Sequence, residues 1–348
     1  MCPFLCFLIL SITGCAKSPA TPELNLYIWS EYLDPQIAAD FSAKTGVKVN
    51  VSVYESSEEM LAKLQHAGGS SQYDLVVVSN MLVPTLVQLK LIQPLDHGRI
   101  PNRQNLDALF LDPAYDPGNH YSLAYQWGTV GLLYNKAKLP GLEPSWGVLF
   151  DPGKQQGRFV LIDEMRDQLG AALIFAGHSA NSTNPDELRQ AGQLVLGAKK
   201  SAKSRGFEGG VGGKNKVAAG LADMAVVWNG DALKAIEENA KGELAYLVPR
   251  EGSLIWADVM VIPAQAPNSE AAHQFIDYLL DAQVGAQLSR FTRYASPNKA
   301  ARQLLPKEDL ENPVLYPPPE ILSRLEYQRE VGEQVRLYDE VWTEVKSR

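Results

Sequence analysis

The sequence predicts an α/β fold, and three observations carry that prediction. From Leu24 onward, short apolar strands alternate with amphipathic helices. Two of the strands, at 74–79 and 225–228, are continuous apolar runs, which is typical of strands buried on both faces of a parallel sheet. The chain has 348 residues, 45% hydrophobic and 21% charged, so it is long enough for two globular domains with separate cores.

The first elements follow a regular order. Residues 24–29 read as a strand, and Asp34 caps a helix that begins at Pro35 and ends at Gly46. Segment 47–54 alternates apolar and polar residues, which predicts a half-buried strand. A helix capped by serine is expected over 57–65, before the apolar strand at 74–79.

A second set of elements follows Trp127. We expect a strand at 158–162, a helix opening at 183–188 and a strand at 225–228. The apolar segment 259–263 is expected to return to the first sheet, and a helix follows over 269–282. The tail 306–348 ends in a largely charged helix, and the sequence contains no internal repeat.

The first fifteen residues look like a targeting signal. Residues 1–14 carry no charge and contain an apolar run, 4–10, that is too short to span a bilayer as a helix. The run closes on Ile12-Thr13-Gly14-Cys15, which resembles a bacterial lipobox. That resemblance implies a lipoprotein signal peptide over 1–14, lipidation of Cys15 and a flexible tether over 15–23. The alternative is an ordinary secretory signal or a short anchor helix.

Composition and motifs argue against several classes of protein. The net charge of −8 and the pI of about 5.3 disfavour nucleic acid as a partner. Cys2 and Cys6 fall in the leader, so the processed chain has no cysteine pair for a disulfide or a thiolate metal site. The five His form no metal-ligand pattern, and no nucleophile elbow is present. We therefore expect neither an enzyme nor a bound metal or cofactor.

The glycine-rich segment 209–214 superficially suggests a phosphate loop. Its spacing is one residue short, and Asn215 stands where a hydroxyl residue would hold Mg²⁺. We expect no strand before it, so the sequence favours a mobile loop.

What does recur is an aromatic residue beside a carboxylate, next to an apolar strand. The occurrences are Trp29-Ser30-Glu31-Tyr32, Trp228-Asn229-Gly230-Asp231 and Trp256-Ala257-Asp258, with an acidic cluster of Asp163, Glu164 and Asp167 after a further strand. Ligands of open α/β sheets bind at the carboxyl ends of strands. Aromatic faces and carboxylates together favour an organic cation. Each single Trp could instead be a core residue.

Seven segments in order carry a family resemblance. They are 27–32, 53–56, 73–77, 228–230, 256–258, 294–298 and 327–332. On these segments the chain is similar to the bacterial spermidine/putrescine-binding proteins that feed ABC importers, over nearly all of 24–348. The resemblance implies a two-domain periplasmic-binding-protein type II fold with a ligand cleft between the domains. The N-terminal domain would comprise 24–126 plus 257–303, and the C-terminal domain 127–256 plus 304–348.

The resemblance also implies roles for individual residues. An aromatic cage would come from Trp29, Tyr32, Trp228, Trp256 and Tyr294. Asp258 would fix one ammonium, and Glu164 with Asp167 would receive another. Polar contacts would come from Ser30, Glu31, Ser79 and Gln328. Asp231 matches a position that is acidic in the putrescine-preferring branch, whereas Met81 replaces a Tyr wall of the spermidine branch.

The implied function is a periplasmic, lipid-anchored, monomeric binding protein for putrescine or spermidine. Its partners would be an ABC permease and ATPase. The choice of polyamine stays open. Two alternatives remain: a protein that binds another amine-bearing solute, such as an aminophosphonate, and a surface lipoprotein that acts as a sensor or adhesin without transport.

Overall fold

The computed structural model describes residues 21–66 and 71–348. The predicted signal peptide, Cys15 and most of the tether lie outside the described residues. Within the described ranges, no helix is both long and apolar enough to cross a membrane.

The described chain is an α/β structure with eleven strands in one sheet system. The strands are β1 Glu23–Trp29, β2 Lys48–Tyr54, β3 Leu75–Ser79, β4 Ile92–Gln93, β5 Ser122–Asn135, β6 Phe159–Ile162, β7 Ser204–Glu208, β8 Met224–Trp228, β9 Leu244–Leu247, β10 Ser253–Pro263 and β11 Leu325–Tyr327. The helices are α1 Pro35–Thr45, α2 Ser57–Gln65, α3 Val83–Gln88, α4 Gly147–Phe150, α5 Met165–Phe175, α6 Pro185–Lys199, α7 Gly212–Ala218, α8 Asn229–Glu238, α9 Ser269–Leu279, α10 Ala282–Thr292, α11 Lys299–Arg302, α12 Lys307–Leu310, α13 Pro319–Leu322 and α14 Val335–Ser347.

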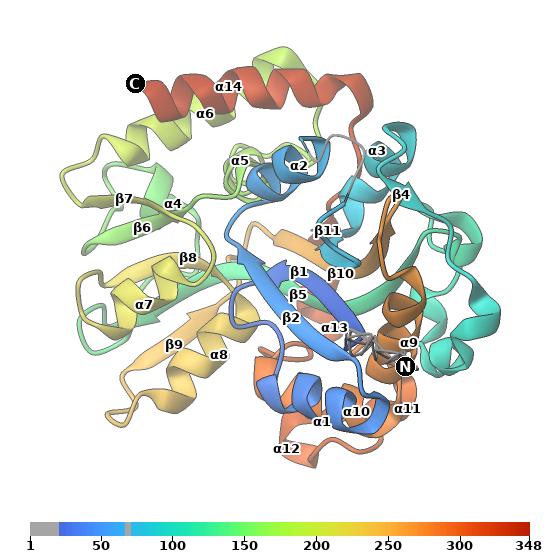
Figure 1. Ribbon diagram of the computed structural model, residues 1–348. Helices are drawn as coiled ribbons and strands as arrows, with labels where there is room; N and C mark the ends of the chain where they lie inside the picture. The colour runs from blue at the N-terminus through green and yellow to red at the C-terminus, as the bar shows by residue number, and fades with distance from the viewer. Residues whose placement is uncertain (1–20, 67–70) are drawn as a thin grey trace, which may run out of the picture.

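The strands form two lobes that share two long central strands. The order is β2-β1-β3-β10-β5-β8-β6-β7, with β4 and β11 added on β10 and β9 on β5. We call the part built on β1, β2 and β3 the first lobe and the part built on β6, β7 and β8 the second lobe (Figure 1). Strands β5 and β10 pair antiparallel and run through both lobes. The predicted domain boundaries, at 126/127 and 256/257, fall inside these two strands and stay a prediction.

Parallel pairing within each lobe brings the carboxyl ends of its strands to one edge of the sheet. In the first lobe β1 pairs parallel with β2 and β3, and in the second lobe β6 pairs parallel with β7 and β8. The carboxyl ends of β1, β3, β6 and β8 therefore lie at the junction between the lobes. Ligands of open α/β sheets bind at such strand ends.

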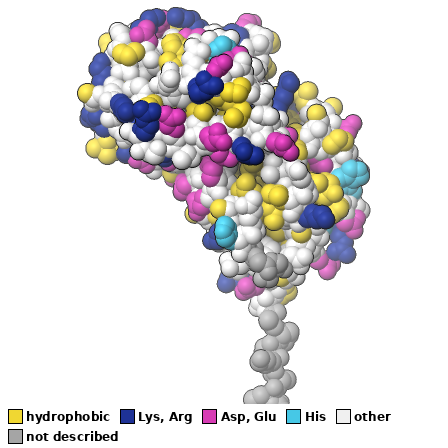
Figure 2. Space-filling view, turned by 90° about the horizontal axis from the view of Figure 1, so that it is seen from above, with side chains coloured by type: hydrophobic (Ala, Val, Ile, Leu, Met, Phe, Trp, Pro, Cys, Tyr) yellow, Lys and Arg dark blue, Asp and Glu magenta, His cyan; other side chains and the backbone are white. Residues whose placement is uncertain are grey.

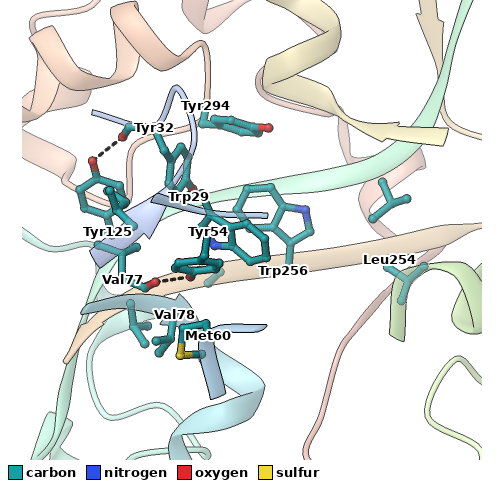
Figure 3. Close-up of a cluster of buried hydrophobic side chains, with 14 of the residues drawn as sticks. Trp29, Tyr32, Tyr54, Met60, Val77, Val78, Tyr125, Leu254, Trp256 and Tyr294 are labelled. Carbon is teal, nitrogen blue, oxygen red and sulfur yellow. Dashed lines mark hydrogen bonds between the residues drawn. The ribbon is translucent and has the colours of Figure 1, made fainter. Parts of the chain in front are cut away.

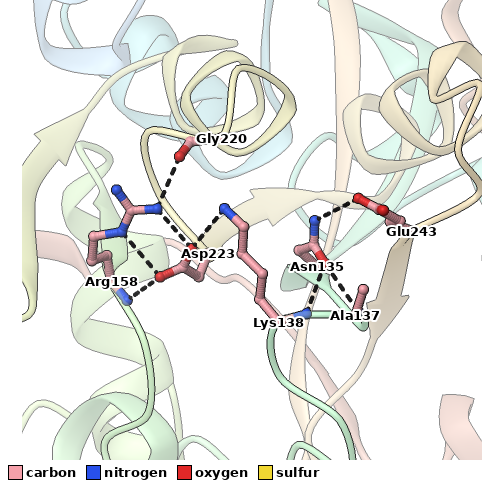
Figure 4. A network of polar contacts seen from close by, with 7 residues as sticks. All are labelled: Asn135, Ala137, Lys138, Arg158, Gly220, Asp223 and Glu243. Atoms are coloured by element: carbon pink, nitrogen blue, oxygen red, sulfur yellow. Dashed lines mark hydrogen bonds and ion pairs between the residues drawn. The ribbon is translucent and has the colours of Figure 1, made fainter.

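At the amino-terminal ends of β6 and β8, the buried carboxylate of Asp223 connects the two strands. Asp223, just before β8, accepts hydrogen bonds from the backbone N–H of Arg158 at 2.8 Å, from Arg158 Nη2 at 2.9 Å and from Lys138 Nζ at 3.1 Å (Figure 4). The guanidinium holds the pKa of the Asp223 carboxyl well below its usual range. This network ties the start of β6 to the start of β8, far from the strand ends that face the other lobe.

Most predicted elements are confirmed with small shifts at their ends. The Asp34 carboxylate accepts from Gln36 N at 2.9 Å, and Gly46 ends α1 with a φ of 77°. The segment at 259–263 does return to the first sheet, because β10 pairs with β3. The helix expected over 269–282 is wrong in extent: Asp281 caps a separate helix, α10, through Gln283 N.

The glycine-rich segment was predicted wrongly. Strand β7 leads into it, and helix α7 begins at Gly212, so it is a tight turn between two elements. Strand β7 is a half-buried edge strand, Ser204–Glu208, with mostly polar residues, and it offers no apolar alternation to recognise.

The position of Trp256 and Asp258 also differs from expectation. The two residues lie in the middle of β10, whereas the sequence suggested that they precede a strand that begins at Val259.

Candidate ligand-binding site

A cavity of about 560 Å³, partly open to solvent, lies between the lobes at the carboxyl ends of their strands. All of the predicted site residues except Glu31 line it: Trp29, Ser30, Tyr32, Ser79, Met81, Glu164, Asp167, Trp228, Asp231, Trp256, Asp258, Tyr294 and Gln328. Residues up to 299 positions apart in the sequence therefore share one wall, which follows from the strand order.

The walls of the cavity are aromatic rings from both lobes. Trp29, at the end of β1, meets Trp228, at the end of β8, edge to face with ring centroids 5.4 Å apart. Tyr294 packs edge to face against Tyr32 and against Trp256, each at 5.2 Å (Figure 3). Such rings present flat apolar faces whose negative quadrupole attracts cations.

Asp258 lies on the long strand β10 at the base of the cavity. It is opposite Ser79 of β3 and Gln126 of β5, and the pairing with β5 shifts register after it. Burial raises the pKa of Asp258 to about 7; the neighbouring Tyr32 hydroxyl opposes that rise and the charge of Asp167 adds to it. This carboxylate therefore lacks a cationic counter-charge from the protein.

Asp167, in the first turn of α5, has both carboxylate oxygens occupied. Trp228 Nε1 donates to Oδ2 at 2.8 Å and Gln328 Nε2 donates to Oδ1 at 2.5 Å. Burial nevertheless raises the pKa of Asp167 to about 6. Two neutral donors orient the carboxylate, and the positive charge of Arg166 opposes the rise in its pKa.

Glu164, at the start of α5, connects the two lobes. Its Oε2 accepts the backbone N–H of Ser57, at the start of α2, at 3.2 Å. Burial and the charges of Glu58 and Asp167 raise its pKa well above the usual range for a carboxyl.

Asp231, in the first turn of α8, is the cavity carboxylate that two lysines influence. Tyr294 Oη donates to its Oδ2 at 2.9 Å. Burial raises the pKa of Asp231 to about 6, although the positive charges of Lys214 and Lys234 oppose that rise.

Glu31 does not line the cavity. The residue has a φ of 54°, and this left-handed turn lets Trp29 and Tyr32 face inward while the Glu31 carboxylate points out. Across the lobe junction, its Oε2 lies 2.7 Å from Lys214 Nζ and 3.5 Å from Lys234 Nζ. The residue thus contributes an ion pair between lobes.

Sequence reasoning missed three lining residues: Ser57, Gly210 and Val211. Ser57 was recognised only as the start of a helix. Gly210 and Val211 sit in the turn before α7, which was taken for a loop. They reach the cavity because the second lobe places that turn beside Glu55 of the first lobe, a contact with no local sequence signal.

The lining combines aromatic rings with four buried carboxylates and contains no Lys, Arg or His. That chemistry suits an organic cation with more than one charge. Among residues 21–66 and 71–348 there is no cluster of three or more His, Cys, Asp or Glu that could hold a metal ion.

A family model described as bacterial extracellular solute-binding protein matches residues 36–317. The chain belongs to this family. The two-lobed fold with its cavity at the lobe junction is the type II fold of these binding proteins, as predicted.

Relatives in this family align with almost the whole chain. Spermidine/putrescine-binding periplasmic protein 1 of Haemophilus influenzae is 32% identical over 96% of this chain and 92% of its own length. The putrescine/cadaverine-binding protein of Pseudomonas aeruginosa is 31% identical over 97% of each. The solved structure of a Listeria monocytogenes protein assigned to a spermidine/putrescine ABC transporter superposes with a TM-score of 0.86 at 34% identity, covering 93% of this chain and 98% of that one.

Proposed function

We propose that this solute-binding protein captures a polyamine outside the cytoplasm and delivers it to an ABC permease with its ATPase. The observation that carries the proposal is the lining of the cavity: aromatic rings and four buried carboxylates, without a basic side chain. Binding proteins for spermidine, putrescine and cadaverine share about a third of its sequence. The role is capture and release, with no chemical change to the ligand.

The electrostatics favour particular positions for the two charged ends. Asp258 has no positive counter-charge, so it would receive one ammonium. For the second, Asp231 is already partly balanced by Lys214 and Lys234, whereas Glu164 faces two further carboxylates. A cation gains most where the negative potential is least compensated. We therefore expect the second ammonium at Glu164 and Asp167.

The alternative ligand classes fit less well. An aminophosphonate would bring an anionic group beside four carboxylates, and no lining side chain could balance it. A sensor of polyamines would use the same cavity, and would differ only in its membrane partner.

Isothermal titration calorimetry of the purified protein tests the proposal. Putrescine, cadaverine and spermidine should release heat with one-site stoichiometry, while a neutral diol of similar length should not bind. No detectable binding of any polyamine, with the protein folded by circular dichroism, would refute polyamine capture.

We further propose that Cys15 carries a lipid anchor that keeps the protein at the membrane. The support is the uncharged apolar run before Ile12-Thr13-Gly14-Cys15. Fatty-acid labelling in cells should mark the wild type and not the Cys15→Ser variant. Labelling of both would show that the lipid, if any, is attached elsewhere.

A further inference from the structure

The cavity residue Gln328 follows β11, a short strand on β10, and has little secondary structure of its own. Strand β11 pairs with only three residues of β10, and Gln328 N reaches Ile255 O at 3.3 Å. Yet its side chain is buried and its Nε2 lies 2.5 Å from Asp167 Oδ1. Something outside the sheet must hold this segment in place.

Asn181 contacts the backbone on both sides of Gln328. Its Nδ2 donates to Tyr327 O at 2.9 Å, and its Oδ1 accepts Arg329 N–H at 2.8 Å. These two groups lie on the edge of the segment that faces away from β10, because the Gln328 N–H between them points the opposite way and donates to Ile255 O of β10. One side chain thus replaces the neighbouring strand that β11 lacks on this side.

A buried arginine fixes the orientation of that amide. Arg166 Nη2 donates to Asn181 Oδ1 at 3.0 Å, and Nη1 donates to Arg329 O at 3.1 Å. The guanidinium also stacks on the ring of Tyr338, 4.6 Å from its centroid, and is 4% exposed. Because a guanidinium can only donate, it selects the amide rotamer whose oxygen faces it.

Arg166 lies between Glu164 and Asp167 in the sequence but does not line the cavity. Its side chain leaves the site and contacts α14 and the segment after β11. The guanidinium therefore acts on the pair only from outside the cavity: its charge opposes the rise in the pKa of Asp167, while its hydrogen bonds go to Asn181 and Arg329.

Resting on the function proposed above, we propose that Asn181 is a positioning residue for ligand capture, acting through Gln328 on Asp167. It does not touch the ligand. It holds the Gln328 amide where it fixes one oxygen of Asp167, while Trp228 fixes the other.

A double-mutant cycle tests this proposal on the full chain. Asn181→Ala and Gln328→Ala should each weaken spermidine or putrescine binding, by about tenfold, the usual effect of losing a hydrogen bond to a charged group. The double variant should be no weaker than Gln328→Ala alone, because the first change acts through the second residue. Additive losses would overturn the proposal.

A ligand-free readout separates this proposal from the polyamine assignment. In carboxyl ¹³C NMR of the unliganded protein, both single variants should raise the pKa of Asp167, since a hydrogen bond to its charged form is lost. An Asp167 titration that moves with Gln328→Ala and stays fixed with Asn181→Ala would contradict the proposal, whether or not polyamines bind.

A control variant and a milder substitution at Asn181 complete the test. Ser323→Ala, an exposed change shortly before β11 whose hydroxyl contacts only Glu320 O, should leave both readouts at wild-type values. If Asn181→Ala fails to fold, Asn181→Ser should keep the fold with a smaller loss in the same direction. If Ser323→Ala changes the affinity and the Asp167 pKa as much as Asn181→Ala does, the effect comes from a general destabilisation of the segment, and the proposal is wrong.

Discussion

The residue on which the account depends most is Asp258, a carboxylate buried among rings without a positive partner. In the absence of ligand this arrangement costs stability, because burial disfavours the ionised form. A bound ammonium stabilises the ionised carboxylate and offsets this loss of stability. Affinity for a cation is therefore obtained at the expense of the stability of the empty protein.

Asp258→Asn should weaken polyamine binding by at least about 2 kcal/mol, roughly 30-fold, because a charge partner of a desolvated ammonium is removed. Calorimetry measures the loss. The exposed change Asp186→Asn, on α6, is the matched control and should bind like wild type. An unchanged affinity in Asp258→Asn would show that another carboxylate is the anchor.

The same variant should unfold at a higher temperature than wild type when both are unliganded at pH 8. The folded-state pKa of Asp258 is raised to about 7, so its folded form holds a proton that the unfolded chain releases near pH 4. Stability from this group is thus lost as pH rises between these values. A lower melting temperature at pH 8 would mean that Asp258 makes stabilising contacts beyond its charge.

Affinity should fall as the pH is lowered from about 7 toward 5. Binding a cation requires ionised carboxylates, and the pKa values of Asp258, at about 7, and of Asp167 and Asp231, at about 6, lie in this window. Ligand binding should accordingly release protons near pH 6.5, which titrations in buffers of different ionisation enthalpy detect. Pure pH independence from 5 to 8 would contradict the assigned carboxylates.

At the scale of elements, the sequence predicted the strands whose ends carry the site, because their apolar runs are continuous and their flanking residues are distinctive. It did not predict β5, a long strand that contains buried polar residues such as Gln126 and Thr129. Their side chains are hydrogen-bonded to Thr292 and Tyr246, which are more than 100 residues away in the sequence. Glu31 was expected in the cavity because the family resemblance implied a polar contact from it. Only the left-handed turn at that residue reverses its direction.

Gly230, in the first turn of α8, shows how an element positions a ring. A Cβ at this position would come within 2.6 Å of the Tyr294 ring, which closes one side of the cavity. Gly230→Ala should displace Tyr294, break its bond to Asp231 and weaken binding about tenfold or more. Gly197→Ala, on α6, where a Cβ meets nothing within 4 Å, is the control. Equal affinities of the two variants would show that Tyr294 is not a wall of the site.

At the scale of the molecule, the lobes also contact each other through charged side chains that do not line the cavity. On the face shown in Figure 2, basic and acidic side chains are interspersed, without a basic stripe of the kind that nucleic acid requires. At the lobe junction, Lys214 is 6% exposed at its side chain and pairs with Glu31. This pair joins the two lobes, and we expect it to break when the lobes move apart.

Glu31→Gln should therefore weaken ligand binding by about three- to tenfold, because Lys214 loses its partner in the closed form. The double variant Glu31→Gln with Lys214→Met should recover most of the loss, since no buried charge is left unpaired. Calorimetry with X-ray scattering of the free protein measures both effects. If Glu31→Gln binds less and the second change does not restore binding, Glu31 contacts the ligand directly.

A crystal structure of the protein with spermidine or putrescine tests the central claim most directly. We predict one ammonium about 2.8 Å from an Asp258 carboxylate oxygen and over the Trp256 ring, and another against Glu164 and Asp167, at the distance of charge-assisted hydrogen bonds. A ligand whose charged ends avoid these carboxylates, or an anion seated in the cavity, would contradict it.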